Sequence, residues 1–156
     1  MSAPIRWPHV TDETALLLTI HLVATAAMAG LIWFVQVVHY PLFALVGEER
    51  FAPYEQRHMS LTTWVVGPFM AIEGITALLI AAGERESLGW GLVLAGLLLL
   101  AVIHASTVFL QVPAHNRLEK GFCPATAERL VRTNWIRTLG WTARVAVAAA
   151  MIYVAS

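Results

Sequence analysis

The stretch Gly89–Asn116, GWGLVLAGLLLLAVIHASTVFLQVPAHN, begins as a continuous apolar run and ends with polar residues at regular intervals. It is long enough for a helix that spans a membrane. At about 100° per residue, the four polar side chains of its second half fall within roughly 60° of one another on a helix. They are His104, Thr107, Gln111 and His115. A stripe of this kind on an apolar helix predicts that the helix lines an internal site, because polar groups are costly against lipid.

The rest of the chain is similarly apolar. Its 156 residues are 58% hydrophobic and 13% charged, with a mean hydropathy of +0.68. This composition predicts a polytopic membrane protein. We expect a single domain over residues 1–156, an all-α integral membrane bundle of four antiparallel helices. The expected helices cover about 15–40, 53–82, 88–112 and 127–155.

The basic residues predict an orientation. The side that holds the first and third connections carries seven lysines and arginines: Arg50, Arg57, Arg117, Lys120, Arg129, Arg132 and Arg137. The other side carries Arg6 and Arg85. By the positive-inside rule, both termini lie outside the cytoplasm, and we expect a bacterial inner membrane with Trp7 at the headgroups. Membrane lipids are therefore expected partners, whereas a net charge of zero gives no support for nucleic acid.

The other three expected helices carry matching stripes. The side chains that share a face are His21, Thr25, Gln36 and His39 on the first, His58, Thr62, Glu73 and Thr76 on the second, and Asn134, Arg137, Thr138 and Trp141 on the fourth. Depth sorts the residues into two layers. The cytoplasmic mouth of the bundle gathers His39, His58, His115, Asn134 and Arg137. The deeper layer pairs Glu73 with Arg144, beside His104, and we expect His21 to be a packing residue nearer the outer side.

Each layer has a structural and a functional interpretation. The mouth histidines are either wetted by headgroups, or three imidazoles (His39, His58 and His115) that bind a divalent metal or act as a base. The deeper residues His104, Glu73 and Arg144 are either structural bonds between helices, or a cofactor-binding or proton-relay group.

Two cofactor classes fit less well. A haem could be held by His39 and His58 at the mouth, but no buried pair of histidines matches in depth. A di-iron centre needs several acids, commonly with a Glu-x-x-His pair. Only Glu73 is expected inside the membrane, and we expect no such pair. A divalent metal, a haem or no cofactor therefore all remain open.

Two short motifs support the mouth as the site. The segments Gln111-Val-Pro-Ala-His-Asn-Arg-Leu and Asn134-Trp-Ile-Arg-Thr, with His39-Tyr-Pro, resemble the anthrone oxygenase-like family of small four-helix membrane proteins. The resemblance implies oxidation of polycyclic phenolic substrates by molecular oxygen without a dedicated cofactor. Carried onto matching positions, it implicates His115, Asn116, Asn134 and Arg137.

The leading functional hypothesis is a membrane oxidoreductase for a hydrophobic aromatic or quinone-like small molecule that enters from the bilayer near Pro68. His115 or His39 would accept a proton, and Arg137 with Asn134 would stabilise the oxyanion. The alternatives are a non-catalytic subunit that packs with other membrane subunits, and a metal- or haem-binding carrier.

Overall fold

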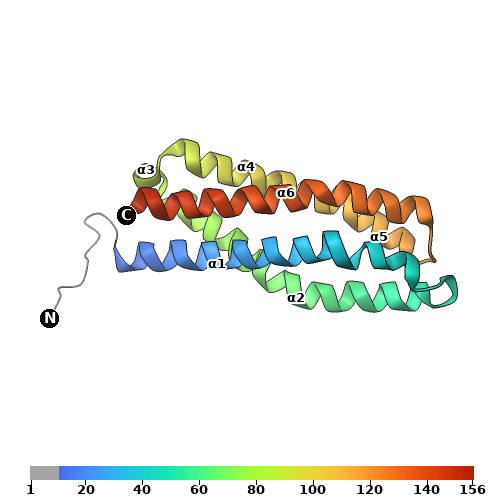
Figure 1. Ribbon diagram of the computed structural model, residues 1–156. Helices are drawn as coiled ribbons and strands as arrows, with labels where there is room; N and C mark the ends of the chain where they lie inside the picture. The colour runs from blue at the N-terminus through green and yellow to red at the C-terminus, as the bar shows by residue number, and fades with distance from the viewer. Residues whose placement is uncertain (1–10) are drawn as a thin grey trace.

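Four long helical segments run antiparallel in the computed structural model, which describes residues 11–156 (Figure 1). The first is α1 (Asp12–Phe34), continued by the π-helical turn η1 (Val35–His39) and the 3-10 turn η2 (Pro41–Leu45). The second is α2 (Glu48–Gly83). The third follows the short α3 (Arg85–Leu88) and comprises α4 (Trp90–Ser106), the π-helical turn η3 (Thr107–Gln111) and α5 (Val112–Leu118). The fourth is α6 (Pro124–Ala155). No strand occurs in residues 11–156, and the predicted all-α bundle is confirmed.

Each of the four segments is long and apolar enough to cross a membrane. Their outer faces expose large apolar side chains such as Trp64, Leu98 and Phe109. The polar stripes are turned inward, as the burial of their members shows. The buried polar residues include His21, Thr25, Glu73, Asn134 and Arg144. The protein is therefore an integral membrane protein whose outer faces suit lipid. The expected position of Trp7 at the headgroups falls outside the described residues.

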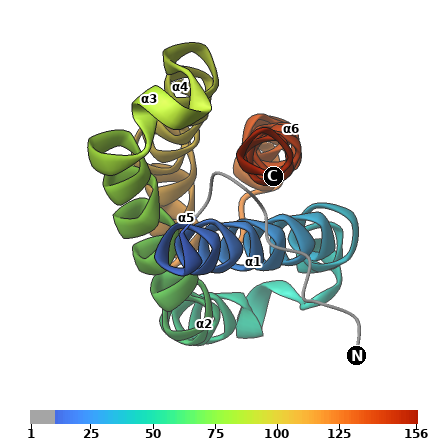
Figure 2. The ribbon, with the colours of Figure 1, turned by 90° about the vertical axis from the view of Figure 1, so that its left-hand side faces the viewer.

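The connections divide between the two ends of the bundle (Figure 1). The start of α1, the end of α6 and α3 lie at one end, which Figure 2 shows from outside. The turn η2, the start of α2, the end of α5 and the start of α6 lie at the other, which we call the η2 end. The predicted up-and-down connectivity is therefore present.

Several helix boundaries differ from those we predicted. Helix α2 begins at Glu48 rather than Pro53, so Pro53 lies within its second turn instead of at its first residue. The third segment continues past Pro113 to Leu118 instead of ending there. The widened turn η3 ends two residues before Pro113. It includes Phe109, whose carbonyl the proline ring would otherwise crowd, and it already interrupts the regular backbone pattern there. Helix α1 begins at Asp12, because the Thr11 hydroxyl caps it by accepting the N–H of Thr14 at 3.2 Å.

The two π-helical turns face the same part of α6. In η1, the side-chain oxygen Oε1 of Gln36 accepts a hydrogen bond from Nδ2 of Asn134 at 2.9 Å. In η3, the Gln111 amide donates to the hydroxyl of Thr133 at 3.2 Å. Each such turn holds one more residue than an α-helical turn and so re-aims the side chains around it. The first and third segments are thereby bonded to neighbouring residues of α6.

An aromatic cluster closes the η2 end. The buried side chains Tyr40, Phe43, Phe51, Leu118 and Leu130 pack together there. Phe43 lies against His39 and His58, with ring centroids 5.2 and 5.5 Å away. This packing disfavours the interpretation in which headgroups wet the mouth histidines. The turn η2 folds Phe43 back over the histidines, and the polar layer lies beneath an apolar plug.

Candidate functional site

Three imidazoles from three segments meet just below the plug. His39 comes from η1, His58 from α2 and His115 from α5. The ring centroids of His39 and His58 lie 4.4 Å apart, and those of His58 and His115 lie 5.6 Å apart. The histidines that the sequence predicted to converge are therefore neighbours.

A carboxylate completes this cluster, and sequence reasoning missed it. Glu55 is fully buried, its Oε1 accepts a hydrogen bond from Nδ1 of His115, and its Oε2 has no partner within residues 11–156. From the sequence, the turn Tyr54 to Arg57 at the start of the second helix is expected to lie outside the membrane and to be exposed to water, but Glu55 within it is fully buried. One face of this turn is covered, because α2 begins earlier and packs under the plug.

The sequence did contain a signal for this residue. Glu55 lies three residues before His58, so both project from one face of α2. The segment Glu55-Gln-Arg-His58 is a Glu-x-x-His pair, which corrects the expectation that the chain has none.

Glu55, His58 and His115 fit a single metal ion. Each offers one ligand atom, and these atoms all lie within 4.8 Å of one another. Ligand atoms about 2.0–2.2 Å from a common ion stand roughly 3–4 Å apart, so small side-chain shifts would close the site. Two histidines and one carboxylate, with positions left open, are the ligand set of non-haem Fe(II) oxygenases. This set has Glu55 where we predicted His39.

His39 and Tyr40 stand behind the possible ligands. His39 Nε2 is 2.9 Å from His58 Nδ1, and the Thr62 hydroxyl is 3.1 Å from the same nitrogen. His58 Nε2 is therefore the nitrogen available to a ligand. The Tyr40 hydroxyl is 2.9 Å from His115 Nε2, which leaves Nδ1 of that ring on the side of Glu55. These contacts fix the ring orientations as outer hydrogen bonds do in metal sites.

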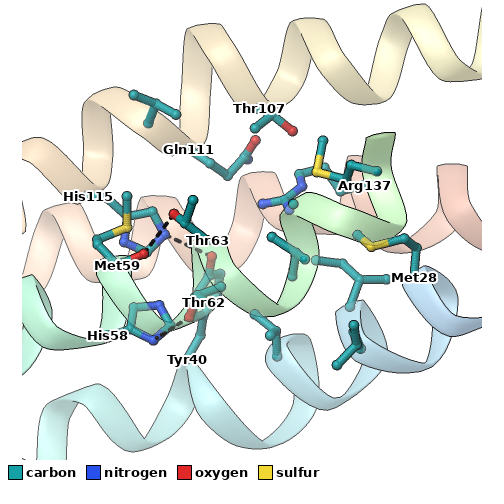
Figure 3. A pocket seen from close by; sticks show the side chains of 17 residues that line it. Met28, Tyr40, His58, Met59, Thr62, Thr63, Thr107, Gln111, His115 and Arg137 are labelled. Carbon is teal, nitrogen blue, oxygen red and sulfur yellow. Dashed lines mark hydrogen bonds between the residues drawn. The ribbon is translucent and has the colours of Figure 1, made fainter. Parts of the chain in front are cut away.

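A cavity of about 250 Å³ adjoins the cluster, and all four segments line it (Figure 3). His58, His115 and Tyr40 contribute polar atoms at one end, and Arg137 reaches in from α6. The remaining wall is mainly apolar and includes Met28, Leu31, Ile32, Val35, Met59, Val66 and Met70. Such a wall with a few polar groups is typical of a small-molecule site.

The cavity opens sideways between α2 and the third segment. Thr63 and Val112 line it and are also exposed on the surface of the bundle. The surface beside them is apolar, since Trp64 is 78% and Phe109 73% exposed. The opening therefore lies in an apolar surface that suits lipid.

Other predicted site residues lie elsewhere. Asn134 is fully buried but does not line the cavity, because its amide donates to Gln36. Asn116 is exposed and lines no part of the cavity. Of the two residues predicted to stabilise an oxyanion, only Arg137 faces the cavity.

The deeper layer contains the predicted ion pair. Arg144 pairs with Glu73, and both are buried. His21, which we expected to be a packing residue, joins the pair: its Nε2 is 3.3 Å from Arg144, and its Nδ1 is 2.8 Å from the Thr76 hydroxyl. His104 does not take that place. Its Nδ1 lies 3.0 Å from the Leu100 carbonyl of its own helix, because a histidine in an apolar helix can bond to the preceding turn.

The positions of His39 and His58 disfavour haem. An iron that binds two imidazoles lies between their nitrogens, with the porphyrin plane between the rings. Here the two rings are hydrogen-bonded directly to each other. A porphyrin therefore cannot lie between these two rings as they are placed.

The protein is an integral membrane four-helix bundle in which a His/Glu cluster, buried at Glu55 and His115 and half-buried at His58, adjoins a largely apolar cavity. No family, no curated protein and no solved structure matches the chain. The chemistry of the site is therefore argued from its own residues.

Proposed function

We propose that this protein is a metal-dependent membrane oxidoreductase that acts on a hydrophobic aromatic small molecule taken from the bilayer. One observation carries the proposal: Glu55, His58 and His115 offer ligand atoms within 4.8 Å of one another, and two of them line the cavity. The anthrone oxygenase-like resemblance favours a phenolic or quinone-like substrate. A redox metal bound there supplies one-electron chemistry with dioxygen.

The side chains around the cavity have different proposed roles. Glu55, His58 and His115 hold the metal, while His39 and Tyr40 orient the imidazoles. Arg137 stabilises the anionic form of the substrate hydroxyl, where a cation shielded from water is most effective. The aromatic plug at Phe43 and Phe51 keeps water away from this end of the cavity.

The simplest balanced reaction is oxidation of a dihydroxylated aromatic ring. The ring loses two electrons and two protons and becomes the quinone, and dioxygen accepts both to form hydrogen peroxide. The substrate enters and leaves between Thr63 and Val112, so it need not leave the membrane.

We place this protein in a bacterial inner membrane with the η2 end in the cytoplasm. Arg137 lies in the cavity, and the other six basic residues of that side (Arg50, Arg57, Arg117, Lys120, Arg129 and Arg132) still outnumber Arg85 and Arg6. Both termini then lie outside the cytoplasm.

Oxygen uptake tests the function directly. The purified protein, reconstituted in lipid nanodiscs and loaded with Fe(II), Mn(II) or Cu(II), is supplied with alkylated hydroquinones. We expect oxygen consumption with matching peroxide release. The His115→Ala variant should lose it, and the Cys123→Ser variant should retain it, because Cys123 is exposed and outside the site. Metal-loaded protein without turnover, or full turnover in a His115→Ala/His39→Ala variant, would overturn the proposal.

A further inference from the structure

We infer that the cavity binds an anionic amphiphile: an acidic oxygen head group lies against Arg137, and a hydrocarbon tail leaves the bundle between α2 and the third segment. The inference rests on the proposed function only in taking this cavity as the substrate site. It adds the charge and the overall form of the ligand.

The first argument is the charge of Arg137. Its side chain is 9% exposed, and its Nε has no hydrogen-bond partner within residues 11–156. The ion pairs in that range are Glu55 with His115 and Glu73 with Arg144, so neither buried carboxylate pairs with Arg137. Residues 1–10 contain no Asp or Glu. A buried cation without a counter-charge is costly in a membrane, and an anionic ligand would supply the missing partner.

The second argument is the charge of the whole site. A divalent metal and Arg137 together carry three positive charges, against one negative charge on Glu55. His58 and His115 bind metal in the neutral form. In the metal-loaded site an anionic head group therefore reduces this excess of positive charge, and an uncharged ligand of the same shape does not.

The third argument is size and access. The cavity measures about 250 Å³, which is below the range of roughly 300–1,000 Å³ of sites that enclose a drug-sized ligand. A long-chain lipid cannot fit inside, but its head group can. The opening at Thr63 and Val112 lies beside exposed Leu61, Trp64 and Val108, so a tail that extends from it would meet hydrocarbon.

Binding measurements on metal-stripped and metal-loaded protein in nanodiscs test the inference. The probes are decanoate, the matched alcohol decanol, and a 4-alkyl-2-nitrophenol, which is anionic near neutral pH and reports binding through its colour. Decanoate and the nitrophenolate both carry an acidic oxygen head group. Comparing their affinities shows whether the cavity prefers a carboxylate or a phenolate. We expect decanoate or the nitrophenolate to bind roughly tenfold or more tightly than decanol.

Arg137→Gln should remove the preference for the acid, and Arg137→Lys should retain part of it. Arg132→Gln, an exposed position on the same helix, is the matched control and should change nothing. A second variant tests the tail: a side chain built at Gly67, in the cavity wall, meets nothing within 4 Å. Gly67→Leu should therefore fold, weaken decanoate binding, and leave butanoate binding unchanged.

Equal binding of acid and alcohol to the wild type, or an acid preference that survives Arg137→Gln, would overturn the inference. If Arg137→Gln does not fold, Gly67→Leu provides the test instead. Decanoate binding to Gly67→Leu as tight as to the wild type would then overturn the inference. The two proposals fail separately. Loss of the acid preference with metal binding intact contradicts only this inference, whereas an acid preference in a chain that binds no metal contradicts only the metal-dependent function.

Discussion

In the proposed metal site, His39 supports a ligand without itself being one. Its Nε2 bonds to Nδ1 of His58, whose other nitrogen faces Glu55 and His115. Outer hydrogen bonds of this kind hold a ligand ring in one tautomer and one orientation. In the proposed metal site His39 is therefore a positioning residue, whereas the sequence predicted it as a ligand.

Replacing His39 tests this role. We expect His39→Ala to lower metal affinity about 10- to 100-fold, and His39→Gln, which can still bond to His58, to restore part of the loss. The measurement is competition with a chelator of known affinity. His104→Ala is the matched control, because His104 bonds to its own helix. Unchanged affinity in His39→Ala would show that His58 needs no such support.

The Glu73–Arg144 pair is a second case at the residue scale, and its role differs. Both charges are buried far from the metal cluster and compensate each other. Glu73→Gln leaves Arg144 charged and uncompensated, so we expect a loss of about 3–5 kcal/mol in stability. Glu73→Gln combined with Arg144→Met should recover most of it. Unfolding in mixed micelles measures both. If the double variant is as unstable as the single one, the pair does more than balance charge.

At the scale of helical elements, α4 and α6 come into close contact through a glycine. A Cβ built on Gly140 would lie 2.7 Å from a side-chain carbon of Ile103, whereas one on Gly96 meets its nearest neighbour at 3.4 Å. Small residues allow membrane helices to approach in this way.

Replacing each of the two glycines by alanine should therefore change the stability of the bundle in different ways. Gly140→Ala should destabilise the bundle by about 1–3 kcal/mol, because Ile103 and α4 must shift. Gly96→Ala should be neutral or slightly stabilising, since alanine favours helix. Thermal unfolding of the two variants in one detergent gives the comparison. Equal effects would mean that α4 and α6 do not pack as closely as described.

The elements also show what sequence can predict. Four apolar segments, their inward polar stripes and the Glu73–Arg144 pair all follow from hydropathy and helical spacing. The π-helical turns η1 and η3 do not, because one added residue leaves the hydrophobic pattern almost unchanged. Glu55 was missed for a related reason: α2 was expected to start at Pro53, which left the first turns outside the membrane. The replacement of His104 by His21 beside Arg144 depends on side-chain reach, which spacing along one helix does not reveal.

At the scale of the whole molecule, the proposed orientation is testable with the protein's single cysteine. Cys123 is exposed at the η2 end, between α5 and α6. A membrane-impermeant thiol reagent should label it in inside-out vesicles and not in intact cells. The matched control is Ser87→Cys in a Cys123→Ser background, at the opposite end, with the reverse pattern. Labelling of Cys123 from outside would invert the topology and place the site at the outer leaflet.

The central claim is that Glu55, His58 and His115 hold a metal ion, and elemental analysis of the purified, metal-reconstituted protein tests it most directly. We predict one tightly held transition-metal ion per chain in the wild type. Glu55→Gln should lose it, while Glu49→Gln, an exposed acid on the same helix, should keep it. Wild-type protein that retains no stoichiometric metal after reconstitution, or Glu55→Gln that retains it in full, would contradict the account.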